Sequence, residues 1–142
     1  MSYVGGMTSN SLPRPTDAEL KLLKVLWERG PSTVRQIHDA LRDETETGYT
    51  TTLKILQKMR EKQLVRRDES QRSHVYEATW RPEQTQRQLV RDLLQRAFGG
   101  SPGKLVVQAL SEQKASADEL AEIRELLDAL EAQQLKSKGR KP

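Results

Sequence analysis

The stretch TTLKILQKMREKQLVRRDESQRSHVYEA, residues 51–78, combines a helical pattern with two short extended segments. At about 100° per residue, its first apolar residues gather on one side of a helix that begins near Tyr49. The other side of this helix is short, polar and basic. Segments 64–67 and 73–78 then flank the polar tip 68–72, which predicts a β-hairpin. The stretch therefore indicates a helix followed by a hairpin.

Two further helices are expected before this stretch. Capping-box patterns, a Ser or Thr followed three residues later by Glu or Gln, begin at Thr16 and Thr33. The first precedes a wide apolar arc that Gly30 and Pro31 end, and the second precedes a short helix that faces the same core. An acidic turn over 43–48 leads to the third helix. Three compact helices and a hairpin are the element order of a winged helix-turn-helix.

The fold class expected is mostly α with a small β-hairpin, an N-terminal winged helix-turn-helix and a C-terminal helical region. Composition shifts, glycines and prolines place the boundaries of four parts. These are a flexible arm over 1–15, a winged-helix domain over 16–81, a helical dimerisation region over 82–133 and a basic disordered tail over 134–142.

Composition excludes several classes of protein. The 142 residues are 35% hydrophobic, enough for one modest core or two small ones. No stretch approaches the roughly 20 apolar residues of a membrane span, so no membrane insertion is expected. The chain has no cysteine and shows no signal-peptide pattern. We therefore expect a soluble, cytoplasmic protein.

Positive charge is concentrated in the predicted third helix and hairpin. Residues 49–72 carry a net charge of +4, which equals the net charge of the whole chain. A recognition helix enters the major groove by its N-terminal turns, where small hydroxyl residues fit, and longer basic side chains reach phosphates or guanine edges. This pattern predicts double-stranded DNA as a partner, although a solvated polar face is the alternative. The candidate DNA-binding residues are Thr50, Thr51, Lys54, Lys58, Arg67 and Arg72.

The second half of the chain carries apolar stripes at helical spacing. Ser116 with Glu119 caps the last of these helices. About 50 residues offer too little surface to bury such stripes alone, so a second subunit is expected to cover them. Folding back onto the first domain is the alternative. The candidate dimerisation residues are Leu89, Leu93, Phe98, Leu105, Leu120, Ile123, Leu127 and Leu130.

Catalytic and metal-binding chemistry is not signalled. The chain has two histidines, expected on a helix surface (His38) and on the hairpin (His74), and it lacks a phosphate-binding loop. We expect no enzyme activity, no metal and no cofactor. Aromatic residues make up 4% of the chain, so a stacking platform for RNA is not expected. A winged helix used as a protein-interaction module without specific DNA binding remains the alternative.

Three motifs carry a family resemblance. The runs LKLLKVLWERGPSTVRQIHDAL, GYTTTLKILQKMREKQLV and RSHVYEA occur in this order. The chain resembles the BlaI/MecI/CopY family of penicillinase-type transcriptional repressors over about residues 16–131. The resemblance implies a homodimer whose N-terminal winged helices bind a palindromic operator and whose C-terminal helices dimerise.

The resemblance also assigns positions. Thr50, Thr51, Lys54 and Lys58 match the recognition helix of the family, and Arg72 and Tyr76 match its wing. Gln63 stands where many relatives carry Gly, at a helix end.

The resemblance leaves the route of release open. In antibiotic-responsive relatives, a membrane sensor-protease triggers cutting of the repressor at an Asn-Phe step. Gln108 and Ala109 occupy the matching positions here. The target genes and the inducing signal are not indicated by the sequence.

Overall fold

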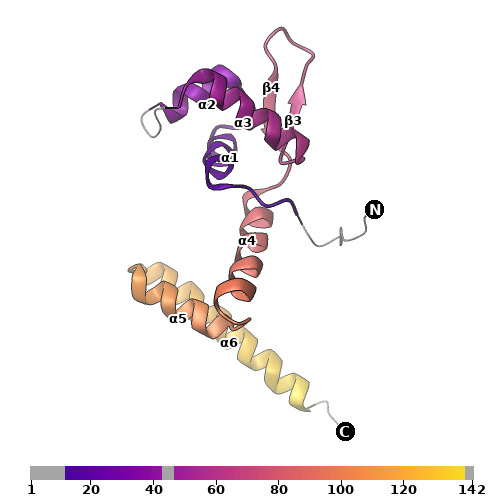
Figure 1. The fold of residues 1–142 in the computed structure, drawn as a ribbon. Helices are drawn as coiled ribbons and strands as arrows, with labels where there is room; N and C mark the ends of the chain where they lie inside the picture. Colours follow the sequence, from indigo (N-terminus) through magenta and orange to yellow (C-terminus); the bar gives the residue numbers. More distant parts are fainter. Residues whose placement is uncertain (1–11, 43–46, 140–142) are drawn as a thin grey trace. The chain divides into compact units, whose positions relative to one another are not determined.

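The structure is a computed structural model that describes residues 12–42 and 47–139. Its contacts divide the chain into an N-terminal unit, residues 1–93, and a C-terminal unit, residues 94–142, which Figure 1 colours along the sequence. This division falls twelve residues beyond the boundary expected after residue 81. Most of the expected arm and most of the expected acidic turn lie outside the described residues.

Three helices lie wholly within the N-terminal unit: α1 (Asp17–Arg29), α2 (Val34–Leu41) and α3 (Tyr49–Glu61). Both predicted capping boxes are confirmed, because Thr16 and Thr33 each accept a backbone N–H three residues on. In return, the backbone amides of Thr16 and Thr33 donate to the side-chain oxygens of Glu19 and Gln36. Gly30 ends α1 with φ of 86°, a left-handed conformation that suits glycine.

A small antiparallel sheet completes the unit. The predicted hairpin is confirmed as β3 (Val65–Asp68) and β4 (Val75–Ala78), within a residue or two of the expected bounds. A third strand, β2 (Ser32–Thr33), pairs with β4, so the strand order is β2-β4-β3. The strand β2 was not predicted, because two residues are too few to show a period-2 pattern.

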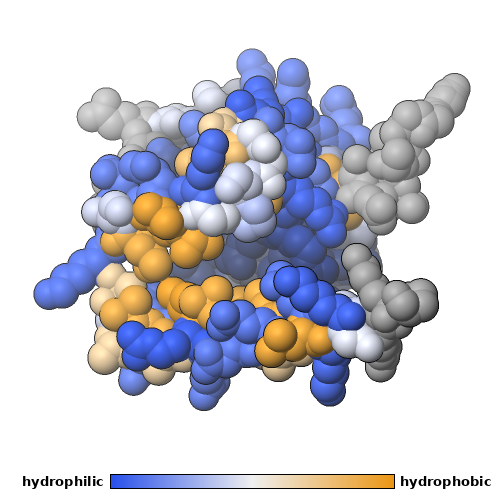
Figure 2. Space-filling model, turned by 90° about the horizontal axis from the view of Figure 1, so that it is seen from below, coloured by the Kyte–Doolittle hydropathy of each residue, from blue (hydrophilic) through white to orange (hydrophobic). Residues whose placement is uncertain are grey.

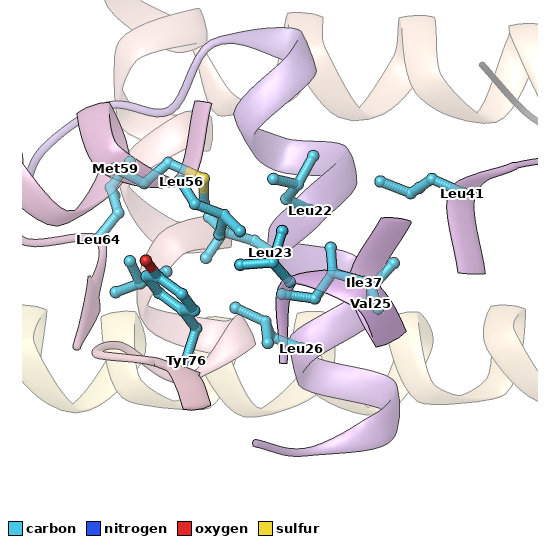
Figure 3. Close-up of a cluster of buried hydrophobic side chains, with 12 residues drawn as sticks. Leu22, Leu23, Val25, Leu26, Ile37, Leu41, Leu56, Met59, Leu64 and Tyr76 are labelled. Carbon is cyan, nitrogen blue, oxygen red and sulfur yellow. The ribbon is translucent and has the colours of Figure 1, made fainter. Parts of the chain in front are cut away.

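The core lies between the three helices and the sheet. Figure 3 shows Leu23 of α1 at its centre, with Leu56 and Tyr76 on one side and Ile37 on the other. Each of these four side chains is at most 2% exposed. The core thus joins α1, α2, α3 and β4 into one body, and it fixes which side of α3 faces outward.

The end of α3 is a Schellman turn with an unfavourable residue. The amide of Leu64 donates to the carbonyl of Met59 at 2.8 Å, and the amide of Gln63 donates to the carbonyl of Arg60 at 3.0 Å. Gln63 has φ of 67°, the one positive φ of a non-glycine residue in the described part of the chain. A residue with a side chain is strained in this conformation, whereas glycine would adopt it without steric cost.

Three more helices follow: α4 (Pro82–Ala97), α5 (Pro102–Glu112) and α6 (Ala117–Gly139). The glycines at 99 and 100 both have positive φ and separate α4 from α5. The predicted cap of the last helix is confirmed by a bond from the amide of Glu119 to the Ser116 hydroxyl.

One expectation for the C-terminal region needs correction. The helix α6 continues to Gly139, whereas a disordered tail was expected from residue 134. Gln, Leu and Lys favour helix, and two lysines in the last turn suit its negative end, so no residue before Gly139 stops it.

Candidate nucleic-acid interface

Helix α3 has one buried side and one exposed side, as the sequence predicts. Thr52, Leu56 and Met59 face the core and are buried. Thr50, Thr51, Lys54 and Lys58 are all exposed, and none of the four forms a salt bridge within the described residues. The structure therefore brings these four predicted residues together on one free helix face.

The cap residue of α3, Gly48, provides no side-chain hydrogen bond to the N-terminal turn of the helix. The first amides of a helix lack partners within the helix and carry partial positive charge, which favours an anion nearby. Thr50 and Thr51 lie in this turn, so hydroxyl groups and a positive helix end coincide.

An aromatic cluster, residues Arg35, His38 and Tyr49, holds the start of α3 against α2. The guanidinium carbon of Arg35 lies 4.7 Å from the centre of the Tyr49 ring. The His38 ring meets the Tyr49 ring edge to face at 5.8 Å. Nδ1 of His38 lies 3.1 Å from Oγ1 of Thr52. His38, expected on a helix surface, is instead half-buried between the two helices.

This cluster was not predicted from the sequence. The spacing of Arg35 and His38, three residues apart on one helix, places them on one side of α2. No pattern in the sequence says that this side meets the first residue of α3, because the contact depends on how α2 and α3 pack.

Arg67 in the wing, the hairpin of β3 and β4, is held by its neighbours. Its side chain is 20% exposed, and its Nη2 donates to Oε1 of Glu69 at 2.9 Å. Hydrogen bonds with Tyr76 and then with Glu69 raise the pKa of Arg67 above its usual value. The hydrogen bond from Arg67 is likewise the main cause that lowers the pKa of Glu69. Arg67 is thus more tightly engaged than the sequence suggested.

The other basic residues of this region divide into paired and unpaired groups. Arg66 pairs with Glu77 across the hairpin at 3.2 Å, and Arg60 lies 3.7 Å from Glu69. Arg72 is exposed and forms no salt bridge with the described residues. Arg72 is therefore the wing cation that remains available to an outside anion.

A groove of about 380 Å³ runs between the start of α2, one side of α3 and the wing. It brings Arg67 and Arg72 together with side chains that the sequence analysis did not select. Thr51, Lys54 and Lys58 do not line it and occupy the neighbouring face of α3. The unforeseen lining residues that can bond an anion or a base are Thr33, Arg35, Tyr49, Gln57, Ser73 and His74.

Half of the predicted dimerisation residues are exposed in the single chain, and the other half are partly covered. Leu93, Leu120, Leu127 and Leu130 are between 40% and 52% exposed. Leu89, Phe98, Leu105 and Ile123 are half-buried. Hydrophobic side chains form orange patches on the face shown in Figure 2.

Further apolar side chains on α5 and α6 are as exposed as the predicted ones. Val107, Leu126 and Leu135 are 68%, 59% and 71% exposed, and neither helix contains a buried residue. The residues at the matched cleavage positions, Gln108 and Ala109, are exposed within α5.

The described residues contain no group of three or more histidine, cysteine or acidic side chains that could hold a metal ion. None of the helices in the described part of the chain is both long enough and apolar enough to cross a membrane.

A helix-turn-helix with a wing and a free basic face on its second helix defines the winged-helix class of DNA-binding transcription regulators. The sequence profile of the penicillinase repressor family matches residues 15–129. The chain belongs to this family, which consists of transcriptional repressors. The resemblance found in the sequence is confirmed.

Two relatives and one solved structure illustrate the similarity. The chain is 34% identical over 123 residues to the transcriptional regulator BlaI of two strains of Mycobacterium tuberculosis, over 85% of this chain and 88% of each relative. The solution structure of the DNA binding domain of the repressor BlaI is similar over 52% of this chain and 90% of that chain. Its TM-score is 0.47 and its sequence identity 20%.

Proposed function

We propose that this protein represses transcription as a homodimer in the cytoplasm by binding a palindromic operator in double-stranded DNA. The observation that carries the proposal is the free outward face of α3, with Thr50, Thr51, Lys54 and Lys58 exposed and without salt bridges in the described part of the chain. The buried side of the same helix fixes this face outward, so the four side chains need no rearrangement to reach DNA.

The proposed contacts divide by chemistry. Thr50 and Thr51, in the N-terminal turn of α3, contact base edges, because short hydroxyl side chains approach base edges without steric cost. Lys54 and Lys58 neutralise phosphates along the major groove. Arg72 and the groove beside it contact the flanking backbone, with Arg67 holding the wing in place.

The dimer supplies the second half of the recognition. A single winged helix offers one recognition helix and a few phosphate contacts, so it binds DNA in the non-specific range of about 10⁻⁴–10⁻⁶ M. Two linked units read both halves of a palindrome and gain affinity through effective concentration. The exposed apolar residues of α4, α5 and α6 support this assembly, because a second copy would cover them.

Selection of duplexes from a random pool by the full chain tests the proposal. We expect enrichment of an inverted repeat whose half-site centres lie about one helical turn apart, roughly 34–36 Å. Pools without any enriched sequence, together with a protein partner that stays bound at high salt, would favour the alternative of a protein-interaction module.

The hydroxyl pair gives a sharper test with the selected duplex. Changing both Thr50 and Thr51 to Ala should cost roughly 1–3 kcal/mol of discrimination between selected and random DNA and leave the fold intact, since both side chains are exposed. The change Thr52→Ala is the contrasting control, because Thr52 is buried and should affect stability instead. If the double variant discriminates between the two kinds of DNA as well as the parent does, specificity comes from residues outside this turn.

A further inference from the structure

The segment just before α1, residues 12–15, lies along α4 within the N-terminal unit. Nε of Arg14 is 3.2 Å from Oδ2 of Asp92. The amide of Leu12 donates to Oε1 of Gln88 at 3.4 Å. Leu12 and both prolines of the segment are half-buried. Because proline restricts the backbone, this segment is a stiff strap that joins the start of α1 to the middle of α4.

The strap contacts Gln88 and Asp92, which lie on a polar stripe of α4 that also carries Thr85. These residues follow a spacing of three and four, so they lie on one side of the helix. Thr85 is 3% exposed, and Nε2 of Gln88 donates to Oδ1 of Asp92 at 3.4 Å. Asp92 is therefore contacted from both the strap and its own helix.

A second tie lies where the chain enters α4. Nε1 of Trp27 on α1 donates to the carbonyl oxygen of Trp80 at 3.0 Å. The amide of Arg81 then bonds to Oε1 of Gln84 and caps the first turn. Trp80 and Asp92 thus attach the start and the middle of α4 to α1 and the strap, and two attachment points along one helix restrict both its direction and its rotation about its own axis.

Rotation of α4 determines where its apolar stripe points. On a helical wheel, Leu89 and Leu93 lie beside the polar stripe of Thr85, Gln88 and Asp92. The strap therefore sets the direction in which Leu89 and Leu93 face relative to α3. In the proposed dimer, this direction decides where the recognition helix of the second subunit lies.

We propose that the contact between Arg14 and Asp92 sets the half-site spacing that the repressor accepts, so that both are specificity-determining residues that never touch DNA. The inference rests on the proposed dimeric, operator-binding function. Recognition helices about 34 Å apart are sensitive to small rotations, because about 10° over that distance shifts one helix by roughly 6 Å. One base pair of duplex is about 3.4 Å long, so a loosened α4 would accept a neighbouring spacing.

The test uses the full chain, the duplex selected by the parent, and versions with one base pair inserted or deleted at its centre. The parent should lose at least about tenfold in affinity when the spacing changes, because bivalent engagement is lost when geometry forbids it. Arg14→Gln and Asp92→Asn should each reduce this penalty to less than about threefold. Both variants should bind an isolated half-site as the parent does.

The two variants separate the strap from overall charge. Arg14→Gln removes a positive charge and Asp92→Asn removes a negative one, so an effect of net charge on DNA affinity would have opposite signs. A role in spacing gives the same broadened profile for both. The combined exchange Arg14→Asp with Asp92→Arg should restore the parent's spacing preference. Arg91→Gln, on α4 and without a salt bridge to the described residues, should keep it throughout.

Three results would overturn the inference in distinguishable ways. Variants with the parent's spacing profile would show that the strap does not set the spacing, while the dimeric function stands. Variants that lose half-site and palindrome binding equally would show that the strap supports the winged helix itself. A parent with no preferred spacing would contradict the proposed dimeric function and the inference with it.

Discussion

At the scale of single residues, Gln63 is the clearest case of strain in the described part of the chain. It occupies the left-handed position of the Schellman turn after α3, where glycine carries no steric cost. Changing Gln63 to Gly should stabilise the protein by roughly 0.5–1 kcal/mol, the balance of relieved strain and the greater freedom of glycine in the unfolded chain.

Urea denaturation at a fixed protein concentration measures the effect of this change. The change Gln57→Gly, in the interior of the same helix, is the matched control and should destabilise by about 1 kcal/mol. If Gln63→Gly also destabilised the protein, the side chain of Gln63 would contribute a contact that outweighs its strain.

The phosphate contacts proposed for α3 also depend on single residues. Binding should weaken with salt, and Lys54→Ala and Lys58→Ala should each reduce the slope of log affinity against log salt by about one. The control is Lys24→Ala on α1, since Lys24 is also exposed and lacks a salt bridge in the described part of the chain. Slopes that fall equally for Lys24 and Lys54 would falsify the assignment of the phosphate contacts to α3.

At the scale of elements, the start of α3 depends on the aromatic cluster of Arg35, His38 and Tyr49. Tyr49→Ala removes an edge-to-face ring contact and a cation–π contact, each worth about 0.5–1.5 kcal/mol. We therefore expect a loss of about 1–2 kcal/mol in stability and a larger loss of binding to the selected duplex than to random DNA.

Tyr49→Phe is the matched control for this prediction because it keeps both ring contacts. Thermal unfolding and fluorescence anisotropy on the two variants provide the comparison. A Tyr49→Ala variant that binds both kinds of DNA as the parent does would show that α3 keeps its position without the cluster.

The elements also show what the sequence could and could not predict. Capping residues and helical periodicity act over three or four neighbours, so Thr16, Thr33 and the two sides of α3 were predictable. The strand β2 and the cluster at Tyr49 depend on segments far apart in the sequence. Their residues carry no local pattern, and only the packed fold brings them together.

The site residues show the same difference between features set by near neighbours and features set by the packed fold. Exposure of Thr50, Thr51, Lys54 and Lys58 follows from the helical wheel alone. The engagement of Arg67 by Glu69 and Tyr76 does not, because it requires the register of the hairpin. The end of α6 was misjudged because a run of basic residues suits both a disordered tail and the last turn of a helix.

At the scale of the whole molecule, the exposed apolar residues of the C-terminal helices are central. Leu93 and Leu127 are 45% and 52% exposed in the single chain, so a charge at either position costs the isolated subunit little. In a dimer interface the same charge would be buried without a partner, which is strongly unfavourable. Changing both residues to Asp should therefore prevent dimerisation and leave the winged helix folded.

Sedimentation velocity and a gel-shift titration on one sample of the Leu93→Asp, Leu127→Asp variant measure whether operator binding requires the dimer. Gln95→Asp with Ala121→Asp, at exposed positions of α4 and α6 away from the apolar stripes, is the matched control and should behave as the parent. We predict a monomer that binds the full palindrome at least about tenfold to a hundredfold more weakly than the parent. A monomer that binds the full palindrome as tightly as the parent would contradict the account.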